Sequence, residues 1–129
     1  SCYSFYPAKN LGAYGDAGLI STKSEKLYIK LLSLRNLGSI KKHDHNLLGM
    51  NSRLDTIQAA VLNRKLKLIL KINEKRRKIA KIYDDKLKEI RHIKITKTNP
   101  GSARHLYVIR TSKRKALADF LKSKNLNTI

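Results

Sequence analysis

A long amphipathic pattern in the second third of the chain is the feature that most limits its possible folds. Apolar residues recur there at helical spacing, and Ser52 and Asp55 are spaced to cap the helix at its start. The stripe, which Arg76 interrupts, consists of Leu62, Leu66, Ile69, Ile72, Ile79, Tyr83, Leu87 and Ile90. The pattern predicts one helix over residues 53–90, with a length on the order of 55 Å. A helix of this length usually bridges two domains or packs against a partner chain.

Shorter elements are expected before this helix. Residues 18–21 predict a short buried strand, and Thr22 and Glu25 have the spacing of a capping box that begins a helix. Gly38 is expected to end that helix. One face of the helix carries Leu27, Leu31 and Leu34. Residues 39–49 predict a polar loop.

A turn, a strand and a helix are expected after the long helix. Residues 99–101, Asn-Pro-Gly, are typical of a turn. Residues 105–110 predict a strand, and residues 112–124 predict a helix. The residues expected to face inward on that helix are Leu117, Phe120 and Leu121.

The chain is strongly basic, with 29 Lys+Arg against 9 Asp+Glu and a formal net charge of +20. On a helix, basic residues spaced by three or four positions would form one stripe: Arg64, Lys67, Lys71, Lys75 and Lys78. Such a stripe could follow a nucleic-acid backbone. A solvated helix face has the same pattern, however, and no aromatic residues alternate with the stripe for base stacking. The solvated face is the preferred interpretation, and nucleic-acid binding is kept as an alternative.

Several other features restrict the class of protein. Cys2 is the only cysteine, so an internal disulfide is excluded, which fits a reducing compartment. No apolar run reaches the roughly 18 residues of a membrane span, and no signal segment is recognisable. His43 and His45 have no further Cys or His nearby, so no metal site is expected. These features predict a cytoplasmic protein that does not contact a membrane.

Lys9 differs from the other lysines in its surroundings. No other basic residue occurs in residues 1–22, and the neighbours of Lys9 are aromatic or small. Partial desolvation among Phe5, Tyr6, Pro7 and Tyr14 would favour the neutral amine, which is the form that attacks a carbonyl. Glycines at positions 12, 15 and 18 allow a sharp turn after the lysine. The residues indicate either a lysine presented for imine chemistry or a glycine-rich turn with a surface lysine.

Two segments then match known motifs. Residues 4–12 are Ser-Phe-Tyr-Pro-Ala-Lys-Asn-Leu-Gly, followed at 15–18 by Gly-Asp-Ala-Gly; residues 49–60 fit Gly-x-Asn-x-Arg-x-x-x-x-Gln-Ala-Ala. In this order and at about this distance, the two segments resemble the cofactor-lysine region of the DegT/DnrJ/StrS-type sugar aminotransferases, which are pyridoxal-phosphate (PLP) enzymes. The similarity continues more loosely through residues 74–77. Ala17 departs from the family, since many members have a second glycine there.

This resemblance implies an α/β fold, namely part of the PLP-dependent transferase fold of the aspartate aminotransferase type (fold type I). Residues 1–50 would form the C-terminal part of the large PLP-binding domain. Residues 51–90 would form the long interdomain and dimer helix, and residues 91–129 would begin a small C-terminal α+β domain. Family members are much longer, so the chain is expected to be a fragment that is not active alone.

The resemblance also implies roles for four residues. Lys9 would bind PLP covalently and carry a proton between substrate and cofactor. Ser4 would donate its hydroxyl to the cofactor phosphate, and Asn51 would reach the phosphate of the neighbouring subunit, so that a homodimer shares its active sites. Arg53 would lie near the same interface. Without the resemblance, Ser4 is a turn hydroxyl and Asn51 a helix-cap residue. Further cofactor-binding residues would precede Ser1.

The function expected from this resemblance is transfer of an amino group to a keto-sugar nucleotide, with glutamate or glutamine as donor, in surface-polysaccharide or secondary-metabolite synthesis. Two alternatives remain. A nucleic-acid-binding protein would use the basic stripe, and its affinity would fall steeply with salt. An inactive truncated relic would retain only the dimerisation helix, and Leu66→Asp would abolish its self-association.

Overall fold

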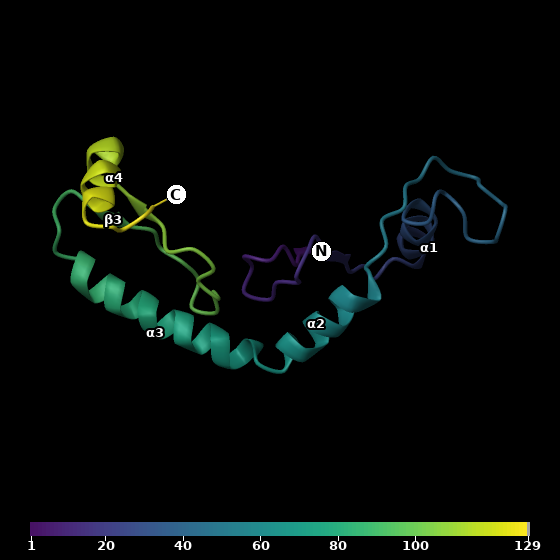
Figure 1. Ribbon diagram of the computed structural model, residues 1–129, viewed down its shortest axis with the longest axis horizontal. Helices are drawn as coiled ribbons and strands as arrows, with labels where there is room; N and C mark the ends of the chain where they lie inside the picture. Colours follow the sequence, from purple (N-terminus) through teal and green to yellow (C-terminus); the bar gives the residue numbers. More distant parts are fainter. Residues whose placement is uncertain (129) are drawn as a thin grey trace. The chain divides into compact units, whose positions relative to one another are not determined.

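The computed structural model describes residues 1–128, which form two units, residues 1–69 and residues 70–128 (Figure 1). The first unit contains strands β1 and β2 and helices α1 and α2. The second contains most of helix α3, strands β3 and β4, and helix α4.

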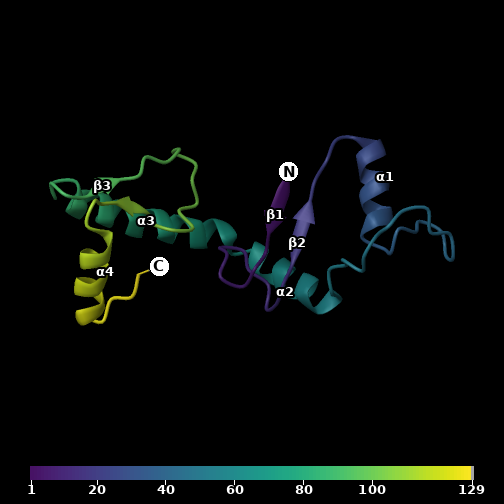
Figure 2. The same ribbon diagram turned by 90° about the horizontal axis from the view of Figure 1, so that it is seen from above.

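The first unit begins with an antiparallel pair of strands, β1 (Cys2–Ser4) and β2 (Gly18–Ile20), in which Tyr3 pairs with Leu19 (Figure 2). The strand expected over residues 18–21 is thereby confirmed, whereas β1 was not predicted. The expected burial of that strand is wrong, since Leu19 is 47% and Ile20 53% exposed. In the described part of the chain, the sheet has only these two strands.

Helix α1 (Glu25–Leu34) confirms the predicted helix, with a different cap. The Ser24 hydroxyl, not that of Thr22, accepts the N–H of Leu27 at 3.3 Å. Thr22 instead accepts the N–H of Ser24 at 3.1 Å, and so stabilises the turn before the helix. The expected end at Gly38 is wrong, because α1 ends at Leu34 with Arg35 as its C-cap. Gly38 lies beyond the cap, where its φ of +78° reverses the chain and its N–H donates to the Ser33 carbonyl.

The polar loop expected over residues 39–49 is confirmed, since no helix or strand lies between α1 and α2. Isolated bridges pair Asn36 with Asn51 and Ser39 with His45. Gly49 passes so close to Gly38 that a Cβ on Gly49 would lie 2.3 Å from the Gly38 nitrogen. No group of three or more His, Cys, Asp or Glu that could hold a metal ion occurs within residues 1–128.

The single helix expected over residues 53–90 is wrong. The structure has two helices, α2 (Thr56–Leu66) and α3 (Ile69–Leu87). The N–H of Leu68 donates to the Lys65 carbonyl, three residues back, in a tight turn that ends the α-helical ladder. Asp55 occupies the N-cap position of α2, but its side chain makes no cap hydrogen bond.

The basic stripe is divided by the same break. Arg64 belongs to α2 and Lys67 to the turn, whereas Lys71, Lys75 and Lys78 belong to α3. A single basic face along one continuous helix is therefore not formed.

In the second unit, β3 (Lys94–Ile95) pairs antiparallel with β4 (Ile109–Arg110). The strand expected over 105–110 is reduced to its last two residues, Ile109 and Arg110. The predicted turn is confirmed at Pro100, where the Ser102 N–H donates to the Asn99 carbonyl at 2.9 Å.

Helix α4 (Arg114–Ser123) confirms the last predicted helix. Leu117 and Leu121 are half-buried, as expected. Phe120 is 57% exposed and lies beneath the Lys124 ammonium, so its predicted inward orientation is wrong.

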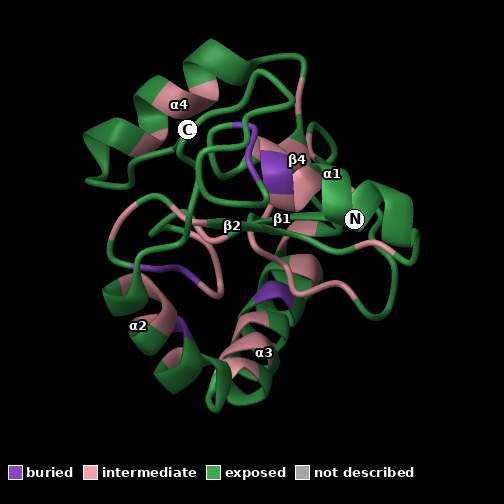
Figure 3. Ribbon diagram, turned by 90° about the vertical axis from the view of Figure 1, so that its right-hand side faces the viewer, coloured by how far each residue is buried: buried purple, intermediate pink, exposed green. Residues whose placement is uncertain are grey.

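Few residues are buried in either unit, as Figure 3 shows. The buried apolar residues of the described chain are Ala13 and Leu62 in the first unit and Ala80 in the second. Many large apolar residues are exposed, among them Leu48 at 100%. Among residues 1–128 there is no helix with the length and apolar character needed to cross a membrane.

Candidate functional site

Lys9 lies in the segment that joins β1 to β2, residues 5–17, which we call the Lys9 loop. Three backbone hydrogen bonds of 2.8 Å close this loop on itself: Phe5 N–H to the Ala17 carbonyl, Ala13 N–H to the Phe5 carbonyl, and Lys9 N–H to the Tyr6 carbonyl. The lysine is thus presented on a loop with a fixed backbone rather than on a loose connection.

Glycine at position 12 permits this closure. A Cβ there would lie 2.3 Å from the Pro7 carbonyl oxygen, so the two arms of the loop approach each other only because Gly12 has no side chain. Lys9 itself is half-buried. The aromatic shielding expected from the sequence is incomplete in this chain, because Tyr6 is 55% and Tyr14 75% exposed.

Helix α2 contacts the Lys9 loop at two points. The Gln58 Oε1 accepts the N–H of Tyr14 at 2.8 Å. The Lys65 Nζ donates to the Gly12 carbonyl at 2.7 Å and lies 4.6 Å from the centroid of the Tyr14 ring. With the buried Leu62, these residues follow a spacing of four and three along one face of α2. On this face of α2, Gln58 lies near the start of the helix, Leu62 one turn later and Lys65 near the end.

Sequence reasoning missed the roles of both α2 residues. Gln58 belongs to the second matched motif, whose function in this chain was assigned only to Asn51 and Arg53. Lys65 falls outside the basic stripe, and its spacing from the apolar Leu62 is the signal that places it on the inner face.

Ser4 occupies the last position of β1, immediately before the Lys9 loop. Its Oγ accepts the N–H of Tyr6 at 3.4 Å. Since the oxygen is the acceptor in this bond, the Ser4 hydroxyl hydrogen can be donated to another partner. Ser4 is exposed, and it precedes Lys9 in the same hairpin.

Asn51 and Arg53 lie in the exposed segment that leads into α2. The Arg53 Nε donates to the Asn51 Oδ1 at 3.0 Å. The backbone on either side is anchored to the end of α1, because Met50 N–H donates to the Leu34 carbonyl and Ser52 N–H to the Arg35 carbonyl, each at 2.9 Å. Neither Asn51 nor Arg53 takes part in the contacts that join α2 to the Lys9 loop.

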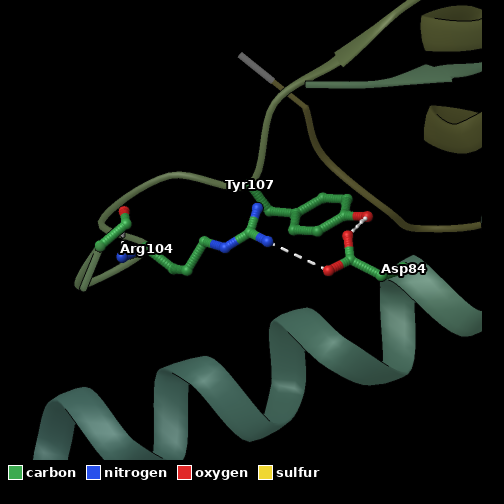
Figure 4. A network of polar contacts seen from close by, with 4 residues as sticks. Asp84, Arg104 and Tyr107 are labelled. Atoms are coloured by element: carbon green, nitrogen blue, oxygen red, sulfur yellow. Dashed lines mark hydrogen bonds and ion pairs between the residues drawn. The ribbon is translucent and has the colours of Figure 1, made fainter. Parts of the chain in front are cut away.

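The second unit contains a polar cluster that the sequence did not suggest (Figure 4). The Asp84 carboxylate of α3 accepts hydrogen bonds from the Tyr107 hydroxyl at 2.7 Å and from Arg104 Nη2 at 3.0 Å. Nearby on the same helix, Arg76 Nη1 donates to the His105 carbonyl at 3.1 Å. Partial burial and the hydrogen bond to Asp84 raise the pKa of Tyr107 to about 12. These contacts attach residues 104–107 to α3.

Comparison with known proteins identifies the family of this chain. Residues 1–129 match the model of the DegT/DnrJ/EryC1/StrS aminotransferase family. The chain is 40% identical over 131 residues to the erythromycin biosynthesis sensory transduction protein EryC1 of Saccharopolyspora erythraea, with 100% of this chain and 36% of the relative covered. It is 37% identical over 131 residues to the dTDP-3-amino-3,4,6-trideoxy-alpha-D-glucose transaminase of Streptomyces venezuelae, with 100% and 35% covered. The chain therefore spans about a third of the length of these curated relatives.

The fold is similarly matched by a solved structure, that of S. venezuelae DesV in complex with a ketimine intermediate. The TM-score is 0.92 at 38% identity, and the match covers 98% of this chain and 34% of DesV. The predicted fold, part of a PLP-dependent transferase of the α/β class, is thereby confirmed. Neither the family nor these relatives support the nucleic-acid-binding alternative. The chain belongs to the DegT/DnrJ/EryC1/StrS aminotransferase family.

Proposed function

We propose that this chain carries the cofactor lysine of a PLP-dependent aminotransferase and that this lysine is Lys9. The observation that carries the proposal is the self-closed Lys9 loop, which presents the half-buried Lys9 five residues after Ser4. An amine suits the aldehyde of PLP, and a hydroxyl donor suits its phosphate, so this pair of groups fits the cofactor. When bound, PLP supplies the electron sink that allows an amino group to be transferred.

Lys9 and Ser4 would have different roles toward the cofactor. The Lys9 amine would first bind the cofactor through its aldehyde. Once the amino donor has displaced it, the freed amine would accept or return a proton at the substrate carbon. The Ser4 Oγ would donate its hydrogen to a phosphate oxygen, since its lone pair already accepts the Tyr6 N–H. Phosphate binding would fix the cofactor's position relative to Lys9.

Asn51 and Arg53 are proposed to act as a pair across a homodimer interface. Arg53 donates to the Asn51 Oδ1, so the Asn51 amide nitrogen, which carries two hydrogens, is the group left to donate to a phosphate of the neighbouring subunit. In this arrangement Asn51 binds the cofactor and Arg53 positions Asn51. The exposure of both residues is compatible with a partner reaching them.

The proposed substrates are a keto-sugar nucleotide and an amino donor, glutamate or glutamine, in a cytoplasmic pathway to polysaccharides or secondary metabolites. Support for the nucleotide sugar comes from the S. venezuelae relative, whose name specifies a dTDP-linked sugar. We propose residues 1–50 as part of the PLP-binding domain, 51–90 as the interdomain segment and 91–129 as the start of a small domain. The boundary between the compact units falls within the proposed interdomain segment.

Borohydride trapping tests the assignment of Lys9. The complete gene product would be incubated with PLP, reduced, digested and examined by peptide mass spectrometry. The label is expected on Lys9, and Lys9→Arg is expected to abolish it and to lower transamination of a keto-sugar nucleotide by about 10³-fold or more. Lys23→Arg, at an exposed lysine of the same unit, is the matched control and should retain both. A label on another lysine of the wild-type protein would disprove the assignment.

A further inference from the structure

The two contacts of α2 with the Lys9 loop point to a role beyond packing. Gln58 and Lys65 are separated from their partners by 44 and 53 residues, yet both reach the loop within 2.8 Å. They attach to neighbouring parts of the same arm of the loop, the carbonyl of Gly12 and the N–H of Tyr14. We propose that Gln58 and Lys65 are positioning residues that hold the Lys9 loop in its productive place; this inference rests on the proposed function of Lys9.

The loop transmits such a constraint to the lysine because its two arms are in direct contact. Gly12 lies against the Pro7 carbonyl with no room for a methyl group, and the Ala13 N–H donates to the Phe5 carbonyl. A displacement of Gly12 or Ala13 therefore displaces Pro7 and Phe5. Lys9 lies in the sequence between these two arms, and its N–H donates to the Tyr6 carbonyl. Holding the second arm from α2 thus holds Lys9.

The Lys9 loop passes close to Gln58. A Cβ on Gly15 would lie 2.9 Å from the Gln58 Nε2, so a larger residue at position 15 would require the end of the Gln58 side chain to shift. Gln58 is partly buried, and its Oε1 is the acceptor for the Tyr14 N–H. A side chain of the same size without an acceptor would leave that N–H without this partner.

The surroundings of Lys65 differ from those of Arg64, the basic residue next to it in α2. Its ammonium is placed between a carbonyl oxygen and an aromatic ring, and its side chain is partly buried. Arg64, the preceding residue of α2, is exposed. A charged hydrogen bond in a partly buried site is stronger than the same bond in water. Lys65 is therefore suited to fix the Gly12 carbonyl, whereas Arg64 is suited to solvent.

The chemical benefit of this arrangement would be geometric. An amine that must meet a carbonyl and then exchange a proton with a substrate carbon has to remain within a small range of positions, and a misplacement of about 1 Å can lower the rate by about 100-fold. Loss of either contact from α2 is expected to loosen the loop without removing any group that touches the cofactor.

Two pairs of variants of the complete gene product test this inference. Gln58→Leu and Lys65→Met remove the hydrogen-bonding groups, whereas Gln58→Glu keeps an acceptor and Lys65→Arg keeps a cationic donor. Arg64→Met is the matched control. Hydrogen–deuterium exchange of the PLP-free protein would report on the loop, and the rate of borohydride-trappable labelling of Lys9, with kcat and KM, would report on the lysine.

Faster exchange in residues 5–17, with α1 unchanged, is expected for Gln58→Leu and Lys65→Met alone. In the same variants, labelling of Lys9 and kcat should fall by about 10- to 100-fold with little change in KM, and the Glu and Arg variants should recover most of the loss. Unchanged exchange, or faster exchange with normal labelling, would overturn the positioning role. If wild-type Lys9 takes no label, the proposed function itself fails; normal wild-type labelling with unaffected variants rejects only this inference.

Discussion

Lysine residues in this chain have different roles that follow from their surroundings. Lys78 forms an ion pair with Glu74 at 2.8 Å, with both side chains largely exposed. The hydrogen bond and charge of Lys78 lower the pKa of Glu74, but such an exposed helical pair contributes little to stability. Lys65, by contrast, is partly buried against a carbonyl and a ring. Of these two lysines, therefore, only Lys65 is expected to be sensitive to substitution.

The raised pKa of Tyr107 predicts that the protein becomes less stable at alkaline pH. Burial and the Asp84 hydrogen bond raise the pKa of Tyr107 to about 12 in the folded chain, against about 10 when unfolded. Between these pH values the unfolded state has released the proton that the folded state retains, so the free energy of unfolding falls as pH rises from about 10 to 12. Below pH 10 the contribution is fully present.

Urea unfolding of the complete gene product between pH 9 and 12 measures this effect. Tyr107→Phe should be less stable than wild type at pH 9 and should show a shallower decline above pH 10. Tyr28→Phe, at an exposed tyrosine of α1, is the control and should keep the wild-type slope. Equal slopes for Tyr107→Phe and wild type would contradict the prediction.

At the level of elements, the segment between α1 and α2 depends on one close backbone approach. At Gly49, a Cβ would lie 2.3 Å from the Gly38 nitrogen and 2.6 Å from the Leu34 carbonyl oxygen. Because these neighbours are backbone atoms, they cannot move aside cheaply. Any side chain at position 49 must displace the adjoining residues, including Asn51.

Gly49→Ala is therefore expected to destabilise the protein by about 1–3 kcal/mol and to weaken PLP binding, because the Asn51 segment moves. Gly101→Ala is the matched control: no atom lies within 4 Å of its Cβ position, and a change within about 0.5 kcal/mol is expected. Thermal unfolding and PLP titration of the complete gene product check both. Wild-type stability for Gly49→Ala would show that the backbone can separate here without cost.

Elements with local signals could be predicted from the sequence, and those without them could not. Helices α1 and α4 and the turn at Pro100 follow from apolar spacing and turn residues. Strand β3 has two residues, too few for an alternating pattern. The break between α2 and α3 is marked by neither glycine nor proline, so the apolar stripe continues through it.

The same limit applies to the candidate site. Lys9, Ser4, Asn51 and Arg53 could be proposed from short motifs, each within one segment. The contacts of Gln58 and Lys65 join segments more than 40 residues apart, and no local pattern encodes them.

At the scale of the whole molecule, the chain buries little apolar surface. It exposes 11326 Å², whereas two separate compact domains of half its mass would together expose about 8,400 Å². The difference is visible in side chains such as Met50 at 68%, Ile57 at 76% and Leu70 at 80% exposure. Both units lack the burial from which globular domains derive most of their stability.

Residues 1–129 produced alone are accordingly expected to unfold without a sharp transition. Circular dichroism during a urea titration should change gradually, and a dye that binds exposed apolar surface should fluoresce before urea is added. The complete gene product is the control and should unfold cooperatively. A steep, single transition of the isolated chain would contradict this expectation.

The contacts between α2 and the Lys9 loop also set an order of events during synthesis. The Lys9 loop leaves the ribosome first, yet its partner Lys65 is added 53 residues after Gly12. At about 5–20 residues per second, this interval is roughly 3 to 10 s. During that time the nascent loop lacks the hydrogen bond from Lys65 to the Gly12 carbonyl. The residue proposed to hold the cofactor therefore reaches its final place only after α2 has been translated.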